Sequence, residues 1–349
     1  MNTSLLFIKH KDFNARTVDN DLVILKENYR VTLKNVNTSK GAGFFFALLS
    51  QLFYLLFSIH RYKIVFIWFA DYHSLLPVFF AKLFGKISVL NIGGYDADEI
   101  LIGTPSGLKA KFRNLCVTYS VKNADSLLSV SDVIKKYLMQ AVPESKCNTV
   151  YCCINTELFS APAGKKENLI ITVGGGGKFI KEAKRKKLDA FIEIGNKFNE
   201  KFPEYNARFY LIGHDEGSET YKFLQPMIIS KNVGLKPMTK SPAGLDDYFS
   251  RASVYMQLSG YEAFGIAQAE AMYERCIPVS NPGGAIPEVV GDAGFLIKDY
   301  DVEKYISTIK DILDGKHEDL RERARTRVKN SFTLEIRRGK LNSVLNSLI

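Results

Sequence analysis

Two glutamates eight positions apart, Glu262 and Glu270, lie where a predicted strand passes into a predicted helix. Gly265 opens that helix, which we expect over 266–274. The first N–H groups of a helix have no intrahelical partner, and the helix dipole favours an anion there, so this end suits a diphosphate. A carboxylate further along can accept hydrogen bonds from both hydroxyls of a ribose. From the spacing alone, two ordinary surface glutamates are an equally good interpretation.

A second segment is rich in glycine and positive charge. Val173 is followed by Gly174, Gly175 and two further glycines, then by Lys178, and later by Arg185 and Lys186. Glycines after a strand let the backbone approach a phosphate, and the cations would neutralise it. Phe179 breaks both the Walker A pattern and the G-x-G-x-x-G fingerprint, which argues against an NAD-dependent oxidoreductase. The alternative to a phosphate-binding role is a solvated basic loop without a ligand.

A third segment, residues 91–96, ends an N-terminal strand with Gly93, Gly94 and then Asp96. Backbone N–H groups of the two glycines could approach a phosphate closely. His73, after the apolar run 63–69, is a further candidate binding residue. A lone histidine is more often structural, and that alternative stays open.

Apolar runs alternate with helical segments in both halves of the chain, which predicts parallel sheets covered on both faces. The expected strands are 5–8, 31–33, 63–69, 87–92, 126–130, 169–173, 207–212, 254–257 and 277–279, and the expected helices are 18–27, 73–84, 106–122, 188–198, 219–229, 266–274 and 286–290. The pattern breaks around 153–166, where we expect a linker. The sequence therefore predicts two doubly wound domains, 1–155 and 156–332, with a cleft at the strand ends. A helix over 333–349 is expected to pack back on the first domain.

The net charge is +10 over 349 residues, and residues 1–155 hold 18 Lys and Arg against 11 Asp and Glu. A basic domain attracts nucleic acid, anionic membranes or phosphorylated substrates. No nucleic-acid-binding motif is present, so we expect no nucleic acid partner. The five cysteines form no C-x-x-C pair, which argues against a disulfide framework or zinc site and suits a reducing cytoplasm. Residues 1–9 read as a first strand rather than a signal peptide.

The stretch 42–59 is apolar except for Ser50 and Gln51. Its 18 residues reach the lower limit for a membrane span. Because Gln51 lies at its centre, we favour a buried or membrane-surface helix, with Lys40, Arg61 and Lys63 near anionic headgroups. The expected location is cytoplasmic, peripheral on the inner face of the membrane.

The stretch 248–265 resembles the donor-site core of family 4 (group 1) glycosyltransferases. The resemblance continues through Glu270-Ala271-Met272, Ile277-Pro278-Val279 and the turn 283–290, and it covers roughly residues 168–300. It implies a GT-B fold, in which two Rossmann-like domains face each other across a cleft.

The resemblance also implies roles for single residues. Glu270 would hold the ribose and Glu262 a sugar hydroxyl, while the backbone of Phe264, Gly265 and Ile266 would meet the diphosphate. Val233 would lie near the nucleobase. Lys186 matches the family's lysine, whereas a glycine replaces its usual arginine, so that Lys178 or Arg185 would have to substitute. Asp96 matches the family's aspartate, but Gly93 stands at the position of the family's sugar-contacting histidine. The resemblance therefore leaves His73 as an alternative contact for the sugar or acceptor, or the backbone N–H groups of Gly93 and Gly94 as contacts for the sugar or phosphate.

The implied function is transfer of a sugar, with retention, from a nucleotide diphosphate sugar to a glycan or lipid-linked acceptor in bacterial surface-polysaccharide synthesis. The expected catalytic residues are Glu262, Lys186 and Asp96. Lys186, nearby cations and the helix start at Gly265 would stabilise the departing diphosphate, so we expect neither metal nor cofactor. Two alternatives remain: a nucleotide-sugar epimerase of GT-B fold, and a catalytically silent nucleotide-sugar-binding subunit.

Overall fold

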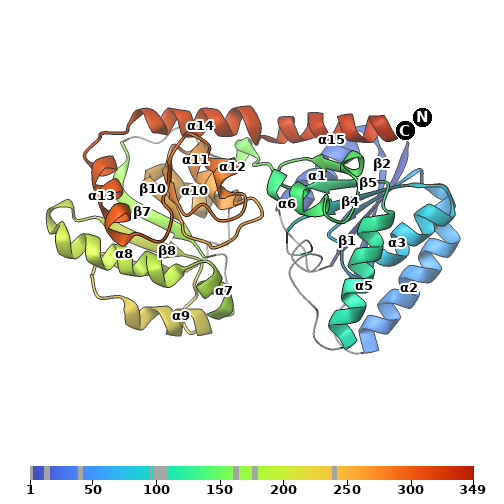
Figure 1. Cartoon of the computed structure of the whole chain (residues 1–349), viewed down its shortest axis with the longest axis horizontal. Coiled ribbons are helices and arrows are strands. Elements are labelled where there is room, and N and C mark those ends of the chain that lie inside the picture. The colour runs from blue at the N-terminus through green and yellow to red at the C-terminus, as the bar shows by residue number, and fades with distance from the viewer. Residues whose placement is uncertain are drawn as a thin grey trace. The chain divides into compact units, whose positions relative to one another are not determined.

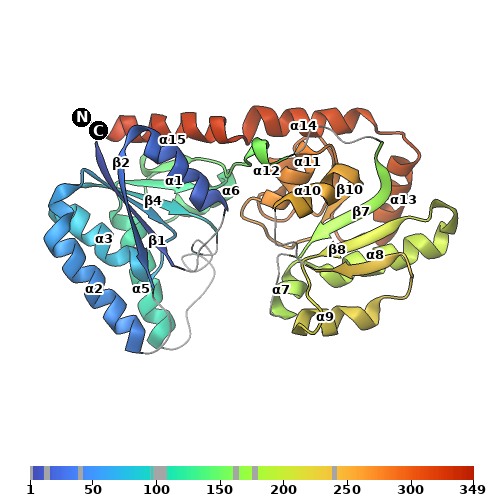
Figure 2. The same ribbon diagram turned by 180° about the vertical axis from the view of Figure 1, so that it is seen from behind.

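A computed structural model describes residues 3–11, 16–37, 42–94, 96, 108–159, 165–174, 180–237 and 242–349, with backbone alone at positions 42, 108, 109, 242 and 243. The chain forms two compact units (Figures 1 and 2). The first unit comprises residues 1–153 and 334–349, and the second comprises residues 154–333.

The first unit is built on a six-stranded parallel sheet in the order β2-β1-β3-β4-β5-β6. Its strands are β1 (Ser4–His10), β2 (Arg30–Val36), β3 (Ile64–Trp68), β4 (Ile87–Ile92), β5 (Ser126–Ser129) and β6 (Cys147–Thr149). Its helices are α1 (Arg16–Asn28), α2 (Ala42–Ser58), α3 (Tyr72–Leu83), α5 (Leu108–Asn123), α6 (Asp132–Leu138) and α15 (Leu334–Leu348). Every residue of β3 and β5 is buried, as expected of strands covered on both faces.

A buried ion pair attaches α15 to the rest of the first unit. The Arg337 guanidinium binds the carboxylate of Asp21 on α1, with Nη2 2.8 Å from Oδ2, and both side chains are almost fully buried. Trp68 Nε1 donates to the same carboxylate at 2.9 Å, and Arg337 Nη1 donates to the Val150 carbonyl at 2.6 Å. Residues from opposite ends of the chain thereby share one hydrogen-bonded network.

The second unit holds another six-stranded parallel sheet, in the order β12-β11-β10-β7-β8-β9. Its strands are β7 (Glu167–Val173), β8 (Arg208–Ile212), β9 (Val233–Lys236), β10 (Ala252–Gln257), β11 (Ile277–Ser280) and β12 (Phe295–Leu296). Its helices are α7 (Ile180–Arg185), α8 (Leu188–Lys201), α9 (Glu219–Leu224), α10 (Pro242–Arg251), α11 (Ile266–Tyr273), α12 (Ile286–Val290), α13 (Val302–Leu313) and α14 (Asp319–Ser331). Two apolar clusters cover the sheet, one centred on Phe191, Phe209 and Ile309 and the other on Leu169, Phe249 and Tyr255.

These two sheets confirm the predicted fold class, an α/β protein with two doubly wound Rossmann-like units. One predicted helix was too long. The helix expected over 219–229 ends at Leu224, and a 3-10 turn, Gln225–Met227, follows it. Pro226 lies in this turn, and proline cannot donate the backbone hydrogen bond that would continue a helix.

The apolar stretch forms α2. The segment Gly43–Arg61 is long and apolar enough to cross a membrane by length and composition, and 22% of it is buried.

Candidate donor site

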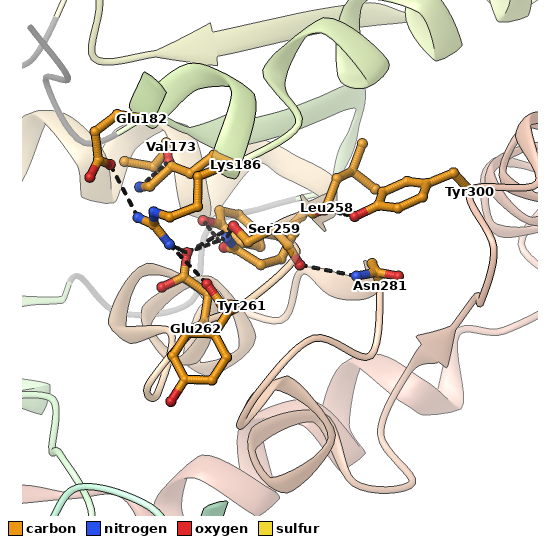
Figure 3. Close-up of polar contacts among 12 residues, drawn as sticks. Val173, Glu182, Lys186, Leu258, Ser259, Tyr261, Glu262, Asn281 and Tyr300 are labelled. Atoms are coloured by element: carbon orange, nitrogen blue, oxygen red, sulfur yellow. Dashed lines mark hydrogen bonds and ion pairs between the residues drawn. The ribbon is translucent and has the colours of Figure 1, made fainter. Parts of the chain in front are cut away.

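In the second sheet, the direction in which successive strands are added reverses between β7 and β10. The chain adds β8 and β9 on one side of β7, then returns to place β10 on the other side. In open parallel sheets, ligands bind in the crevice at the carboxyl ends of the two strands beside such a reversal. Here those ends are Val173 and Gln257. Figure 3 shows Lys186, Ser259 and Glu262 gathered beside Val173.

Glu262 is held in place by the strand that precedes it. Its Oε1 accepts hydrogen bonds from Ser259 Oγ at 2.8 Å and from Gln257 Nε2 at 3.2 Å. Arg185 Nη1 lies 3.7 Å from the same oxygen. The side chain is 18% exposed, so the carboxylate is fixed in position yet accessible.

Arg185 connects the end of α7 to the Glu262 loop. Its Nη1 donates to the Tyr261 carbonyl at 2.8 Å, its Nη2 donates to Glu182 at 3.1 Å, and its own carbonyl accepts from the Gly260 N–H at 3.1 Å. The guanidinium therefore links α7 to the Glu262 loop, while the Arg185 side chain stays 40% exposed.

Lys186 follows directly and points back toward the end of β7. Its Nζ donates to the Val173 carbonyl at 3.4 Å, a long bond (Figure 3). Burial lowers the pKa of this amine, and the neighbouring Glu262 carboxylate acts in the opposite direction. A cation with a single, weak hydrogen-bond partner among the described residues, beside the switch point, is suited to receive a negatively charged group.

The turn Gly283-Gly284 packs closely against the backbone of the Glu262 loop. The Ala285 N–H donates to the Glu262 carbonyl at 2.8 Å. Gly284 has a φ of +62°, and a Cβ there would lie 2.3 Å from that carbonyl oxygen. A Cβ on Gly283 would lie 2.5 Å from the Gly260 carbonyl oxygen. Only glycines allow the two backbones to approach this closely.

The start of α11 also lies at this edge of the sheet. Gly265, its N-cap, has a φ of +97°, and Gly265 and Ile266 are partly exposed. The Phe264 side chain is buried against the Phe332 ring at 5.2 Å, so its backbone is the part that a ligand could reach. Glu270, one turn further along α11, is 5% exposed.

His214 is a site residue that the sequence analysis missed. It follows β8, is 2% exposed, and has no hydrogen-bond partner for either ring nitrogen among the described residues. Its Nε2 would lie 2.1 Å from a Cβ on Gly174, so the glycine makes room for the ring. Burial and, to a lesser extent, the positive charge of Lys186 together lower its pKa to about 4, so the imidazole is neutral at pH 7. A lone histidine after a strand forms no motif, and only the packing against Gly174 reveals it.

The interpretation of Val233 as a nucleobase contact does not fit its position. Val233 opens β9 and pairs with Phe209 near the start of β8, at the end of these strands opposite to the crevice. It is 5% exposed and packs in the core against Gly195. Ligands bind at the carboxyl ends of the strands, and Val233 lies at the amino end of β9. It is therefore a core residue. Two other predicted donor contacts, Gly175 and Lys178, lie outside the described residues.

In the first unit, Asp96 organises the loop after β4. Its carboxylate accepts hydrogen bonds from the N–H groups of Ala70 at 3.0 Å, Gly93 at 3.0 Å and Gly94 at 2.8 Å. It is fully buried, and burial raises its pKa to about 6. The expectation that the Gly93 and Gly94 N–H groups bind a ligand is therefore wrong for this structure, because both groups donate to Asp96.

Gly93 stands where the family's histidine is expected, and the Phe69 ring fills that space. The ring atom Cε1 would lie 1.9 Å from a Cβ on Gly93. His73 does not replace the histidine, because it is fully buried. Its Nε2 lies 2.9 Å from the Trp68 carbonyl, and burial lowers its pKa to about 4. His73 is therefore a core residue of α3 in this structure.

No group of three or more His, Cys, Asp and Glu suited to a metal ion occurs within the described part of the chain.

Residues 155–331, just over half of the chain, match the family "Glycosyl transferases group 1". The chain belongs to this family, and its class of activity is sugar transfer. No curated protein matches the chain significantly.

Three solved structures illustrate the likeness in fold. A sucrose-phosphate synthase from Thermosynechococcus elongatus is 15% identical, with a TM-score of 0.75 over 99% of each chain. HepE from Anabaena, solved in complex with UDP and glucose, is 12% identical, with a TM-score of 0.74 over 99% of this chain and 100% of that one. The lipopolysaccharide outer core galactosyltransferase WaaB is 13% identical, with a TM-score of 0.70 over 99% of this chain and 100% of that one. At these identities the likeness establishes the GT-B fold alone.

Proposed function

We propose that the protein transfers a sugar from a nucleotide diphosphate sugar to a glycan or lipid-linked acceptor, with retention of configuration. The position of Lys186 carries this proposal, because its amine lies beside the switch point with a carboxylate neighbour and, within the described part of the chain, one long hydrogen bond. Anabaena HepE, a protein of the same fold, was solved with UDP-glucose, which supports a donor of this class. Family 4 is the branch of the group that we assign.

In the proposed reaction, the bond between the anomeric carbon and the diphosphate breaks while a bond to the acceptor oxygen forms on the same face. The acceptor proton passes to the departing diphosphate. Negative charge grows on the diphosphate during this step, so groups aimed at it stabilise the transition state more than the bound donor. Lys186 and the first N–H groups of α11 are assigned this role, without a metal ion or cofactor.

The donor sugar and ribose are assigned to the two glutamates. Glu262 is fixed by Ser259 and Gln257, so its orientation is set before a sugar hydroxyl arrives. Glu270 would accept hydrogen bonds from the ribose. Asp96 is assigned a positioning role, through the loop that it holds together. We place the enzyme at the cytoplasmic face of the membrane, in bacterial surface-polysaccharide synthesis.

Thermal unfolding with UDP, GDP, ADP and their sugars tests the donor assignment. A ligand at about 100 times its dissociation constant stabilises the protein by about 2.7 kcal/mol, which shifts the unfolding temperature by a few degrees. Glu270→Ala should weaken the successful nucleotide about ten- to a hundredfold, since a hydrogen bond to a charged group is worth about 1.5–3 kcal/mol.

Glu193→Ala is the matched control, because Glu193 is 52% exposed and pairs with Lys197 on the surface of α8. An unchanged titration in folded Glu270→Ala would remove Glu270 from the site. Conversion of the donor to its epimer without any acceptor would favour the epimerase alternative.

A further inference from the structure

Helix α2 leaves large apolar side chains exposed along one side, which is unusual for a helix that only covers a core. Six large apolar residues on it are exposed: Phe45, Phe46, Leu49, Phe53, Leu56 and Phe57. At 100° per residue they fall within about 120° of the helix circumference, so they form one stripe. We call these six residues the α2 face. Phe45, Phe46 and Phe57 each leave 67–69% of their surface exposed.

The opposite side of α2 carries the helix's polar anchors. Gln51 is 1% exposed, and its Nε2 donates to the His73 carbonyl on α3 at 2.8 Å. Ser58 is also buried, and the Tyr54 hydroxyl lies 2.8 Å from that of Tyr62. These polar contacts and the fully buried Leu55 hold α2 on the first unit, while the α2 face points outward.

Two neighbouring helices extend the apolar exposure. Figures 1 and 2 both show α3 between α2 and α5. Phe79 and Leu83 of α3 are 44% and 62% exposed, and Leu115 of α5 is 61% exposed. Scattered exposed apolar residues are ordinary, whereas such a concentration marks an interaction surface.

The surrounding charge is one-sided. From residue 28 to residue 95 the sequence holds seven Lys and Arg and a single acidic residue, Asp71. Arg61 and Lys63 are exposed just after α2. Lys34 Nζ lies 4.4 Å from the Tyr54 ring centre, and Lys86 Nζ donates to the His60 carbonyl at 3.2 Å. These contacts gather cations at the carboxyl end of α2.

We propose that the α2 face inserts into the surface of an anionic membrane, with the cations around Arg61 and Lys63 on the lipid phosphates. A stripe of Phe and Leu beside cations has the chemistry of a helix that lies in the membrane interface. A second copy of the chain is a poorer partner, because a two-fold contact would bring two basic rims together. A membrane span would have to break the hydrogen bonds of Gln51 with the His73 carbonyl and of Tyr54 with Tyr62. This inference adds to the proposed function the part of the chain that meets the lipid, and it does not depend on the donor site.

Sedimentation of the full chain with vesicles tests the proposal. Vesicles of phosphatidylcholine containing phosphatidylglycerol should bind the protein, vesicles of phosphatidylcholine alone should bind it more weakly, and rising salt should weaken binding. Phe46→Ser/Phe53→Ser/Phe57→Ser should reduce binding by about a hundredfold or more, because three aromatic side chains lose their apolar environment. Val23→Ser is the control, since Val23 is 55% exposed on α1 of the same unit.

A second pair of variants tests the contribution of positive charge to membrane binding. Arg61→Glu/Lys63→Glu should weaken binding to the anionic vesicles by about tenfold or more. Lys222→Glu/Lys329→Glu changes the net charge equally in the second unit and should have much less effect. Nucleotide-induced thermal shifts should persist in all four variants, which separates this test from that of the donor site.

Three outcomes would overturn the proposal: absence of binding to anionic vesicles at low salt, equal binding by the triple Phe variant, or resistance of the bound protein to alkaline extraction, as expected of a spanning helix. A dimer that dissociates in the triple Phe variant and does not bind vesicles would identify a second copy as the partner instead.

Discussion

Lys186 combines a positive charge with partial burial beside the end of β7. Because charge on the diphosphate grows as the sugar leaves, we expect Lys186→Ala to lower kcat by about 10²–10³-fold with a smaller effect on KM. Steady-state kinetics with the donor identified by thermal shift measures both constants. Lys184→Ala is the control, because Lys184 is an exposed cation on α7, which ends one residue before Lys186. A change confined to KM would make Lys186 a docking group.

His214 makes the second unit sensitive to acid. Its pKa is about 4 in the folded protein and 6.5 ordinarily, so the unfolded chain binds the proton more readily. The neutral ring therefore contributes stability that is complete above pH 6.5 and is lost as the pH falls toward 4. The shift corresponds to about 3 kcal/mol. We expect the free energy of unfolding of His214→Gln to depend less on pH in this range.

Urea unfolding at pH 7 and near pH 4.5 measures this difference, and exposed His60→Gln should behave as the parent protein does. Parallel pH dependence in His214→Gln and the parent would show that His214 titrates normally. In the first unit a similar comparison would be less clear. There the raised pKa of Asp96 makes the folded state less stable as the pH rises, whereas the lowered pKa of His73 makes it more stable, so the two contributions oppose each other.

The sequence was informative about residues that belong to a motif and silent about those that packing brings together. The position of Glu262 could be predicted, because a loop between a buried strand and a helix must lie at the sheet edge. The contact between His214 and Gly174 could not, since it joins two strand ends that are 40 positions apart. The role of Gly93 was equally hidden, because the Phe69 ring that fills its space is 24 positions away.

At the level of elements, the turn between β11 and α12 holds the Glu262 loop in position. Gly284→Ala would place a Cβ 2.3 Å from the Glu262 carbonyl oxygen at a positive φ. We expect it to destabilise the protein by about 2–3 kcal/mol and to weaken nucleotide binding, because the loop must shift. Chemical unfolding and nucleotide titration measure the two effects.

Gly315→Ala separates backbone strain from this clash. Gly315 has a φ of +79° but no atom within 4 Å of an added Cβ, so its substitution should cost about 1–2 kcal/mol and leave nucleotide binding unchanged. Equal losses of nucleotide affinity in both variants would contradict the support assigned to the turn.

Helix α2 shows a limit of periodicity analysis. The existence of the helix was predictable because its apolar run is long. Its orientation was not, since apolar residues surround nearly the whole circumference and the pattern contains no polar face. The hydrogen bond of Gln51 to the His73 carbonyl decides which side is buried, and it depends on the position of α3.

For the whole molecule, the pair Arg337–Asp21 joins the last helix to the first unit. Arg337→Met would leave the Asp21 carboxylate buried without its cation, which typically destabilises a protein by about 3–5 kcal/mol. Arg338→Met is the control, because Arg338 pairs with Glu27 at the surface and should change stability by at most about 1 kcal/mol. Thermal and urea unfolding measure the difference, and equal stability of the two variants would contradict it.

The alternation of strands and helices predicted both sheets. The contact between Arg337 of α15 and Asp21 could not be predicted in this way, because the two residues are 316 positions apart.

The divided first unit also sets an order of events during protein synthesis. Residues 1–153 leave the ribosome first, yet Asp21 meets its cation only after residues 154–333 have been translated. At about 5–20 residues per second, those 180 residues take on the order of 10–40 s. Throughout that interval the nascent chain carries a first unit with an uncompensated carboxylate, while the second unit can complete its own sheet. The part made first is therefore finished last, and a chain released early exposes an unfinished first unit to chaperones and proteases.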